Sequence, residues 1–371
     1  MTKTAPRSET PQAATHRSPY RSAAELAAAG LVAADAELAR VEDQFAISLS
    51  RPLAVLIDRN DPHDPIARQF LPDIAELVTT PEERADPIGD HVRSPLDGLV
   101  HRYPDRVLLK VINVCPVYCR FCFRREMVGP GNATHLSSEA LDAALTYIAD
   151  HKEIFEVILT GGDPLLLSPR RLGDLIERLA AIDHVAVLRI HTRVPVAEPG
   201  LVSDELVACL KSARQSVYVA LHANHPRELT EDARAACARL IDAGIPMLSQ
   251  SVLLRGVNDD VETLAQLMRA FVAARVKPYY LHHPDLARGT SHFRVSIEDG
   301  QALVRQLRGR ISGLCQPHYV LDIPGGFGKV PLGQSFVTKT GEAYRIEDFR
   351  GAPHVYPPSS GGSVSDETAK A

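Results

Sequence analysis

Six short apolar runs alternate with helical patterns from Arg106 onward, and this alternation limits the possible folds more than any other feature. The clearest helical pattern runs from Leu264 to Phe271, with apolar residues at i, i+3, i+4 and i+7. Its N-cap is Asp259 or Asp260. When each strand is followed by a helix, neighbouring strands pair in parallel and are joined by right-handed crossovers. The sequence therefore predicts an α/β fold, an open three-quarter TIM-type (β/α)6 barrel. The six runs cover residues 107–112, 155–159, 185–190, 217–221, 245–248 and 278–281.

The remaining segments are predicted to flank this barrel, which we place at residues 101–331. Residues 1–20 are rich in Ser, Thr, Pro and Ala without periodicity, which is typical of a disordered arm. Residues 21–100 are predicted to be a helical extension without a catalytic role, loop-like from 80 to 104. Residues 332–371 are predicted to be a C-terminal extension that ends in a disordered tail containing Pro-Pro-Ser-Ser-Gly-Gly.

Composition excludes several classes of protein. Hydrophobic residues make up 45% of the 371 residues, which is ample for a large core, and the net charge of −5 disfavours nucleic acid or an acidic membrane as a partner. The sequence lacks an apolar run of about 18 residues, so we expect no membrane span. It also lacks the apolar stretch of a secretory signal. Cys209, Cys237 and Cys315 are scattered singly, so we expect a reducing, cytoplasmic location.

Cys115, Cys119 and Cys122 directly follow the first apolar run, with C-x3-C-x2-C spacing. Ferredoxin-type clusters and structural zinc sites use four protein ligands, and no fourth cysteine is close by. Half of a zinc site, or three unrelated cysteines, would be the alternatives. The spacing resembles that of the radical S-adenosylmethionine (SAM) enzymes. The resemblance implies a [4Fe-4S] cluster held by three thiolates, with SAM chelating the open iron.

Glycines and polar residues follow the later runs. Gly161, Gly162 and Asp163 come directly after the second run, where two glycines would let the backbone approach a ligand such as SAM. A plain turn is the alternative. His191 and His222 follow the third and fourth runs, and for each a hydrogen-bonded loop histidine is as good an interpretation as contact with SAM.

A glycine-rich turn from Asp322 to Lys329 ends in a lysine. A lysine on such a flexible turn can form a Schiff base with pyridoxal phosphate (PLP), although a surface turn with a solvated lysine is the alternative. Arg102 and Arg106, just before the first run, are two arginines able to grip a phosphate dianion.

From about Asp61 to Pro331 the chain resembles the lysine 2,3-aminomutase family of PLP-dependent radical SAM enzymes. Besides the motifs above, the resemblance rests on Gln250-Ser-Val-Leu-Leu, Gly-Val-Asn-Asp259, Pro-Tyr-Tyr-Leu281, Asp285-Leu, His292-Phe-Arg294 and Ser-Gly313. It implies that Lys329 carries PLP, that Arg102 and Arg106 with Tyr103 between them bind its phosphate end, and that Gln250 lies beside PLP and SAM.

The resemblance also implies a substrate site. Arg124 would pair with the substrate α-carboxylate. Asp285 and Asp322 would receive the far end of the substrate, because two carboxylates in a water-poor pocket need a cation such as the lysine ε-ammonium. The alternative is that both aspartates are loop N-caps.

The implied reaction is a 1,2-amino shift that converts L-lysine into β-lysine, started by a 5′-deoxyadenosyl radical. Arginine, ornithine or glutamate as substrate, or β-lysine supply for modifying elongation factor P, are the alternatives, as is a non-enzymatic iron–sulfur sensor. A flavodoxin or ferredoxin would donate the electron, and a homo-oligomer is expected. The zinc site of fermentative members is not expected, because position 260 is Asp and no cysteine follows Cys315.

Overall fold

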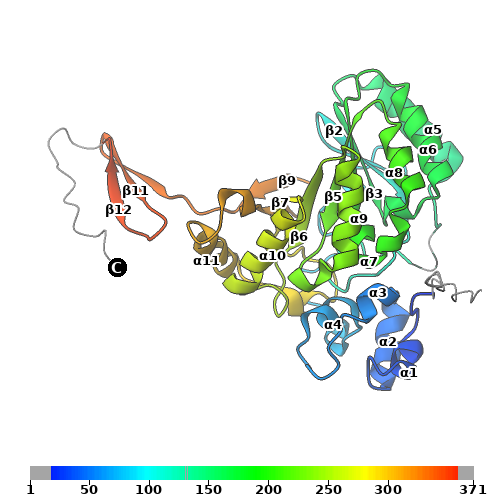
Figure 1. The fold of residues 1–371 in the computed structure, drawn as a ribbon, viewed down its shortest axis with the longest axis horizontal. Coiled ribbons are helices and arrows are strands. Elements are labelled where there is room, and N and C mark those ends of the chain that lie inside the picture. Colours follow the sequence, from blue (N-terminus) through cyan, green and yellow to red (C-terminus); the bar gives the residue numbers. More distant parts are fainter. Residues whose placement is uncertain (1–17, 130, 132, 358–371) are drawn as a thin grey trace, which may run out of the picture.

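The six apolar runs form six neighbouring parallel strands in the structure, a computed structural model that describes residues 18–129, 131 and 133–357. Each strand is followed by a helix that covers the outer face of the sheet, so the (β/α)6 prediction is confirmed (Figure 1). The strands are β2 (Arg106–Ile112), β3 (Glu156–Gly161), β4 (Val187–Thr192), β5 (Ser216–His222), β6 (Met247–Val252) and β7 (Lys277–His282). The helices are α5 (Ser138–Asp150), α6 (Pro169–Ala180), α7 (Val194–Ala197), α8 (Asp204–Lys211), α9 (Glu231–Asp242), α10 (Val261–Ala273) and α11 (Ile297–Leu307).

The helix starts follow the capping residues in the sequence. Ser137, Asp260 and Ser296 each accept a backbone hydrogen bond from the first turn of α5, α10 and α11. The apolar sides of these helices and the outward side chains of the strands form one continuous core. The barrel is therefore held by burial of the helix layer against the sheet.

Three further strands extend the sheet beyond the prediction. β8 (His318–Ile323) pairs parallel with β7, and β9 (Gly328–Pro331) pairs antiparallel with β8. β1 (Leu99–Tyr103) pairs antiparallel with β2, so the expected loop from 80 to 104 is wrong at its end. No backbone ladder joins β1 to β9 in the described part of the chain, which leaves the barrel open between them.

The N-terminal extension is helical, as predicted. It contains α1 (Ala23–Ala28), α2 (Ala36–Gln44), α3 (Arg51–Ala54) and α4 (Pro65–Phe70), grouped below the barrel in Figure 1. Their apolar residues form a second core that includes Val117 from the cysteine loop. Of the expected disordered arm, residues 1–17 lie outside the described residues, and Tyr20 is paired with Leu49 in a β-bridge.

The C-terminal extension forms a small sheet that the sequence analysis did not predict. β10 (Val337–Thr340), β11 (Ala343–Glu347) and β12 (Pro353–Tyr356) are antiparallel and lie apart from the barrel (Figure 1). The expected tail from residue 358 lies outside the described residues. Among the described helices, none is both long and apolar enough to cross a membrane.

Candidate active site

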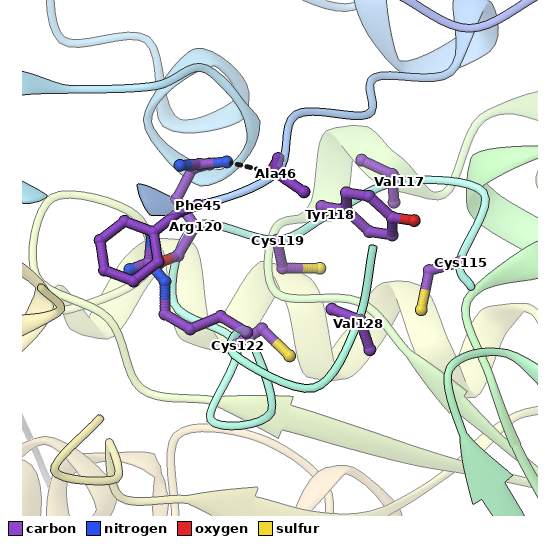
Figure 2. Close-up of a pocket in the computed structure, with 10 residues that line it drawn as sticks. Phe45, Ala46, Cys115, Val117, Tyr118, Cys119, Arg120, Cys122 and Val128 are labelled. Carbon is purple, nitrogen blue, oxygen red and sulfur yellow. Dashed lines mark hydrogen bonds between the residues drawn. The ribbon is translucent and has the colours of Figure 1, made fainter. Parts of the chain in front are cut away.

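The three clustered cysteines lie on the loop that follows β2. Figure 2 shows their sulfur atoms around one shared space, next to Tyr118 and Val128. This space, the thiol cavity, has a volume of about 50 Å³ and is lined mainly by apolar atoms, with Cys115, Cys119 and Cys122 among its residues. Burial raises the pKa of all three thiols, to about 12 for Cys119. They are therefore poor thiolates on their own and need a bound metal to ionise.

The arrangement of these thiols fits an iron–sulfur cluster better than a zinc ion. All three cysteines are free of disulfides. Within the described residues, no three Cys, His, Asp or Glu side chains lie close enough to share a single metal ion. The thiols are spread around the cavity instead, which suits a cluster in which each cysteine binds a different iron atom.

The cysteine loop is anchored by a buried carboxylate from the N-terminal extension. Glu76 is fully buried and accepts hydrogen bonds from Arg120 Nε at 2.9 Å and from Arg125. Burial alone would raise the pKa of Glu76, but the two guanidinium groups lower it. The backbone N–H of Tyr118 also donates to Ser48 O. The N-terminal extension, for which no catalytic role is predicted, thus supports the cysteine loop structurally.

The glycine turn after β3 holds the same loop from the barrel side. Gly162 N donates to Ile112 O at 2.5 Å, and a Cβ at Gly162 would lie 2.1 Å from Val114 O. Gly161 has a φ of +116°. The two glycines thus permit close approach of the cysteine-loop backbone, and their contact with SAM stays a prediction. Asp163 is buried and accepts a hydrogen bond from the backbone N–H of Arg193 at 2.7 Å.

A buried polar network continues from Arg193 at the end of β4. Its guanidinium pairs with Glu228 at 2.6 Å and lies 2.5 Å from His222 Nδ1. The His222 ring stacks on Phe121, with 6.1 Å between the ring centroids. Burial, followed by the charge of Arg193, lowers the pKa of His222 well below its usual value. His222 is therefore a neutral acceptor between the cysteine loop and the barrel interior.

A second cavity, the basic cavity, lies inside the barrel with a volume of about 220 Å³. Its lining carries four basic side chains against one carboxylate, Glu156. The four are Arg102, Arg106, Arg189 and Lys329. This excess of positive charge in a concave, partly apolar space favours an anionic ligand. Tyr103, His191 and Gln250 line the same cavity, so the sequence-predicted residues 102, 103, 106, 250 and 329 are brought together.

The sequence analysis placed Lys329 on a flexible turn. In the structure Lys329 lies in strand β9 instead. Its backbone N–H donates to the Tyr103 hydroxyl at 2.6 Å across the open side of the barrel. Its ammonium lies 2.9 Å from Asp322 Oδ1. Arg106 lies over the Tyr103 ring at 3.8 Å and pairs with Asp105 at 2.6 Å. The lysine backbone is therefore fixed, and only its side chain is free to reorient.

Asp285 and Asp322 influence each other as the sequence analysis expected. Burial, followed by the charge of Asp322, raises the pKa of Asp285 to about 8. Burial would also raise the pKa of Asp322, but His282 and Lys329 lower it below its usual range. One member of the pair is thus protonated and the other ionised near neutral pH, and one added cation would favour ionisation of both.

Arg124 is held by Asp90, a residue that the sequence analysis did not single out. Asp90 Oδ2 accepts from Arg124 Nε at 3.0 Å and from one of its terminal nitrogens at 2.9 Å. The other terminal nitrogen donates to Thr160 Oγ1 at 3.0 Å. Asp90 Oδ1 accepts from Arg102 at 2.9 Å. The buried Asp90 carboxylate therefore joins Arg102, which is expected to bind the PLP phosphate, to Arg124, which is expected to bind the substrate carboxylate.

Other site residues also escaped the sequence analysis. Glu76, Asp90 and Glu228 are acidic residues in loops or short turns, where no periodic pattern marks them. Arg189 lies on β4 and pairs with Glu156 of β3 at 3.1 Å. Its position as a charged residue inside an apolar run was the available signal.

Comparisons with known proteins agree with this geometry. Residues 109–268 match the Radical SAM superfamily, so the barrel and its cysteine loop are those of a radical SAM enzyme, a class that uses a [4Fe-4S] cluster and SAM. The chain is 41% identical over 302 residues to the L-lysine 2,3-aminomutase of Clostridium subterminale, covering 81% of this chain and 72% of that protein. The chain belongs to the lysine 2,3-aminomutase family.

Two further matches differ in name from that relative. The chain is 36% identical to the glutamate 2,3-aminomutase of Clostridioides difficile (strain 630), over 82% of this chain and 71% of that protein. A crystal structure of a radical SAM methyltransferase from Sphaerobacter thermophilus aligns with a TM-score of 0.43 and 20% identity, covering 60% of this chain and 68% of that one. Family membership makes this chain an enzyme. The two relatives are named for different amino acids, lysine and glutamate.

Proposed function

We propose that this enzyme is a PLP-dependent 2,3-aminomutase that converts L-lysine into β-lysine. The observation that carries the proposal is the 2.9 Å contact between Lys329 and Asp322 at the edge of the basic cavity, inside the same barrel that carries the three cysteines. A lysine able to bind an aldehyde cofactor and a carboxylate able to bind a substrate cation are therefore neighbours.

The basic cavity fits PLP in charge and in donor set. Arg102 and Arg106 would hold the phosphate together with Arg189, which lines the same cavity, and each of the three guanidinium groups also pairs with a carboxylate. Lys329 would hold the aldehyde carbon. When bound, PLP would delocalise an unpaired electron on the substrate, and the cluster with SAM would supply the radical that generates it.

The side chains around the cavities would orient the substrate and exclude water. Asp285 and Asp322 would neutralise a side-chain ammonium, and Arg124 would hold the carboxylate at the other end. Neutral His222 and the His191–Gln250 pair, whose side-chain nitrogens are 2.9 Å apart, would keep the space between the cavities polar but uncharged. We further propose a cytoplasmic homo-oligomer reduced by a flavodoxin or ferredoxin.

The aspartate pair also ranks the alternative substrates. A glutamate side chain would bring a third carboxylate beside Asp285 and Asp322, which is unfavourable in a buried pocket. Arginine and ornithine carry cations and are the second candidates. β-Lysine supply for elongation factor P would use the same reaction, so the pathway is left open by the site.

Anaerobic turnover tests the proposal. Protein reconstituted with iron and sulfide is incubated with PLP, SAM and dithionite, and with L-lysine, L-arginine, L-ornithine or L-glutamate in parallel. β-Lysine, separated from L-lysine by chromatography after derivatisation, is the expected product. Asp322→Lys should abolish lysine turnover while SAM binding is retained. Turnover of glutamate but not lysine, or normal lysine turnover by that variant, would contradict the proposed substrate.

A further inference from the structure

A second buried cation, Lys110, lies in the same layer of the barrel as Arg124. On β2, Arg106 and Leu108 line the basic cavity, whereas Val107 and Leu109 pack into the core under the helices. Side chains alternate along a strand, so Lys110 belongs to the inward row. Its partner in the sheet register is Thr160, the residue that accepts a hydrogen bond from Arg124.

Lys110 has no hydrogen-bonded or ion-paired partner in the described part of the chain, although carboxylates lie within electrostatic range. It is 9% exposed, yet its ammonium makes no hydrogen bond or ion pair with any described residue. Burial, followed by the charge of Arg124, lowers the pKa of Lys110, against the opposing charges of Asp90, Asp97 and Asp86. A buried cation that no counter-ion contacts is unfavourable, which favours the binding of an anion nearby.

Arg124, in contrast, has a direct counter-ion in Asp90, which it shares with Arg102. Three of its five N–H groups donate to Asp90 and Thr160. Asp90 is 1% exposed, and its other oxygen is occupied by Arg102. Two N–H groups of Arg124 are thus left for a ligand, whereas Lys110 is the cation in this layer that no described carboxylate contacts.

We propose that Lys110 and Arg124 together bind the carboxylate of the amino-acid substrate. Lys110 supplies the charge, and Arg124 supplies the two remaining N–H donors and the direction of approach. This inference rests on the proposed function only in that the substrate is an amino acid, and it does not depend on which side chain the pocket accepts.

Binding of paired ligands tests it without turnover. Isothermal titration calorimetry on protein loaded with cluster and PLP, without reductant, compares L-lysine, L-arginine and L-glutamate with their α-amides, which lack the carboxylate charge. For the accepted amino acid, Lys110→Met should weaken binding of the acid roughly 10- to 100-fold. Binding of its amide should change by less than about 2-fold, because the amide carries no charge for Lys110 to bind.

Two further variants separate binding from structure. Lys110→Arg keeps the charge and should retain most of the preference for the acid. Lys211→Met, at the exposed end of α8, should leave both affinities unchanged. Equal losses for acid and amide in Lys110→Met, or no loss for the acid, would overturn the role of Lys110, as would a wild-type protein that prefers no amino acid over its amide. Preference for arginine or glutamate would refute the lysine assignment alone.

Discussion

Asp322 and Lys329 are direct partners in the antiparallel pair β8–β9, and their side chains meet at 2.9 Å. The same lysine is the group expected to bind PLP, and the same aspartate is expected to bind the substrate cation. Asp322 therefore has a cation beside it before substrate arrives. A substrate ammonium would take the place that the Lys329 ammonium leaves when that side chain turns toward the cofactor.

Removing this lysine should separate PLP binding from cluster binding. Lys329→Ala should abolish the near-visible absorbance of PLP-loaded protein and all turnover, because the cavity loses its only amine among the lining residues. Iron content should be unchanged, since the lysine does not line the thiol cavity. Lys339→Ala, in exposed β10, is the matched control. Retained absorbance in Lys329→Ala would mean that another amine carries PLP.

Asp90 should be more important for stability than surface acids of the same kind. Asp90→Asn leaves Arg102 and Arg124 with reduced counter-charge in the interior, and breaking a buried ion pair costs roughly 3–5 kcal/mol. Asp142→Asn removes an ion pair with Arg178 at the surface, where the side chain of Asp142 is 65% exposed and that of Arg178 is 40% exposed. This loss should cost less than about 1 kcal/mol. Urea unfolding measures both free energies. Similar losses in the two variants would show that Asp90 does not bear the two buried charges.

Asp285 should make stability fall with rising pH. Its pKa is about 8 in the folded chain and about 3.9 in an unfolded one, so between about pH 4 and 8 only the folded state keeps the proton. The free energy of unfolding then decreases as pH rises through that window, by at most about 1.4 kcal/mol per pH unit. Asp285→Asn should lose this dependence and become more stable relative to wild type at pH 8 than at pH 5. A constant difference between the two proteins would argue against the raised pKa.

Gly162 should tolerate no side chain. A Cβ at this position lies 2.1 Å from Val114 O, which is backbone and cannot move aside cheaply. Gly162→Ala should cost about 1–3 kcal/mol in unfolding free energy and lower the iron bound per chain after reconstitution, because the cysteine loop is displaced. Gly313→Ala meets nothing within 4 Å and is the control. Full iron loading of Gly162→Ala would exclude a link between this contact and the cluster.

The sequence predicted features whose pattern is local. The strands β2 to β7 are apolar runs, and Asp260 is a capping residue directly before the apolar helix α10, so neighbouring residues alone indicate both. The site residues at strand ends were also predictable, because the carboxyl ends of parallel strands meet at one edge of the sheet.

Features that depend on distant partners were not predictable in this way. Asp90 contacts Arg102 and Arg124, 12 and 34 residues further along the chain, through loop geometry that no periodic pattern encodes. β1 contains His101 and Arg102 next to only two aliphatic residues, so its pairing with β2 decides its conformation more than its composition does. The role of Lys110 likewise depends on a register that only the folded sheet provides.

The hydrogen bond from the Lys329 backbone to the Tyr103 hydroxyl crosses the open side of the barrel, as does the contact between Arg102 and Asp322. Any switch of the lysine amine between aspartate and cofactor must therefore occur by rotation about side-chain torsions, with the main chain standing still. Such rotations take nanoseconds rather than the microseconds of a moving loop. The rotation of the amine from aspartate to cofactor would then be too fast to limit the rate of the enzyme, whereas the covalent exchange at the cofactor is a separate chemical step.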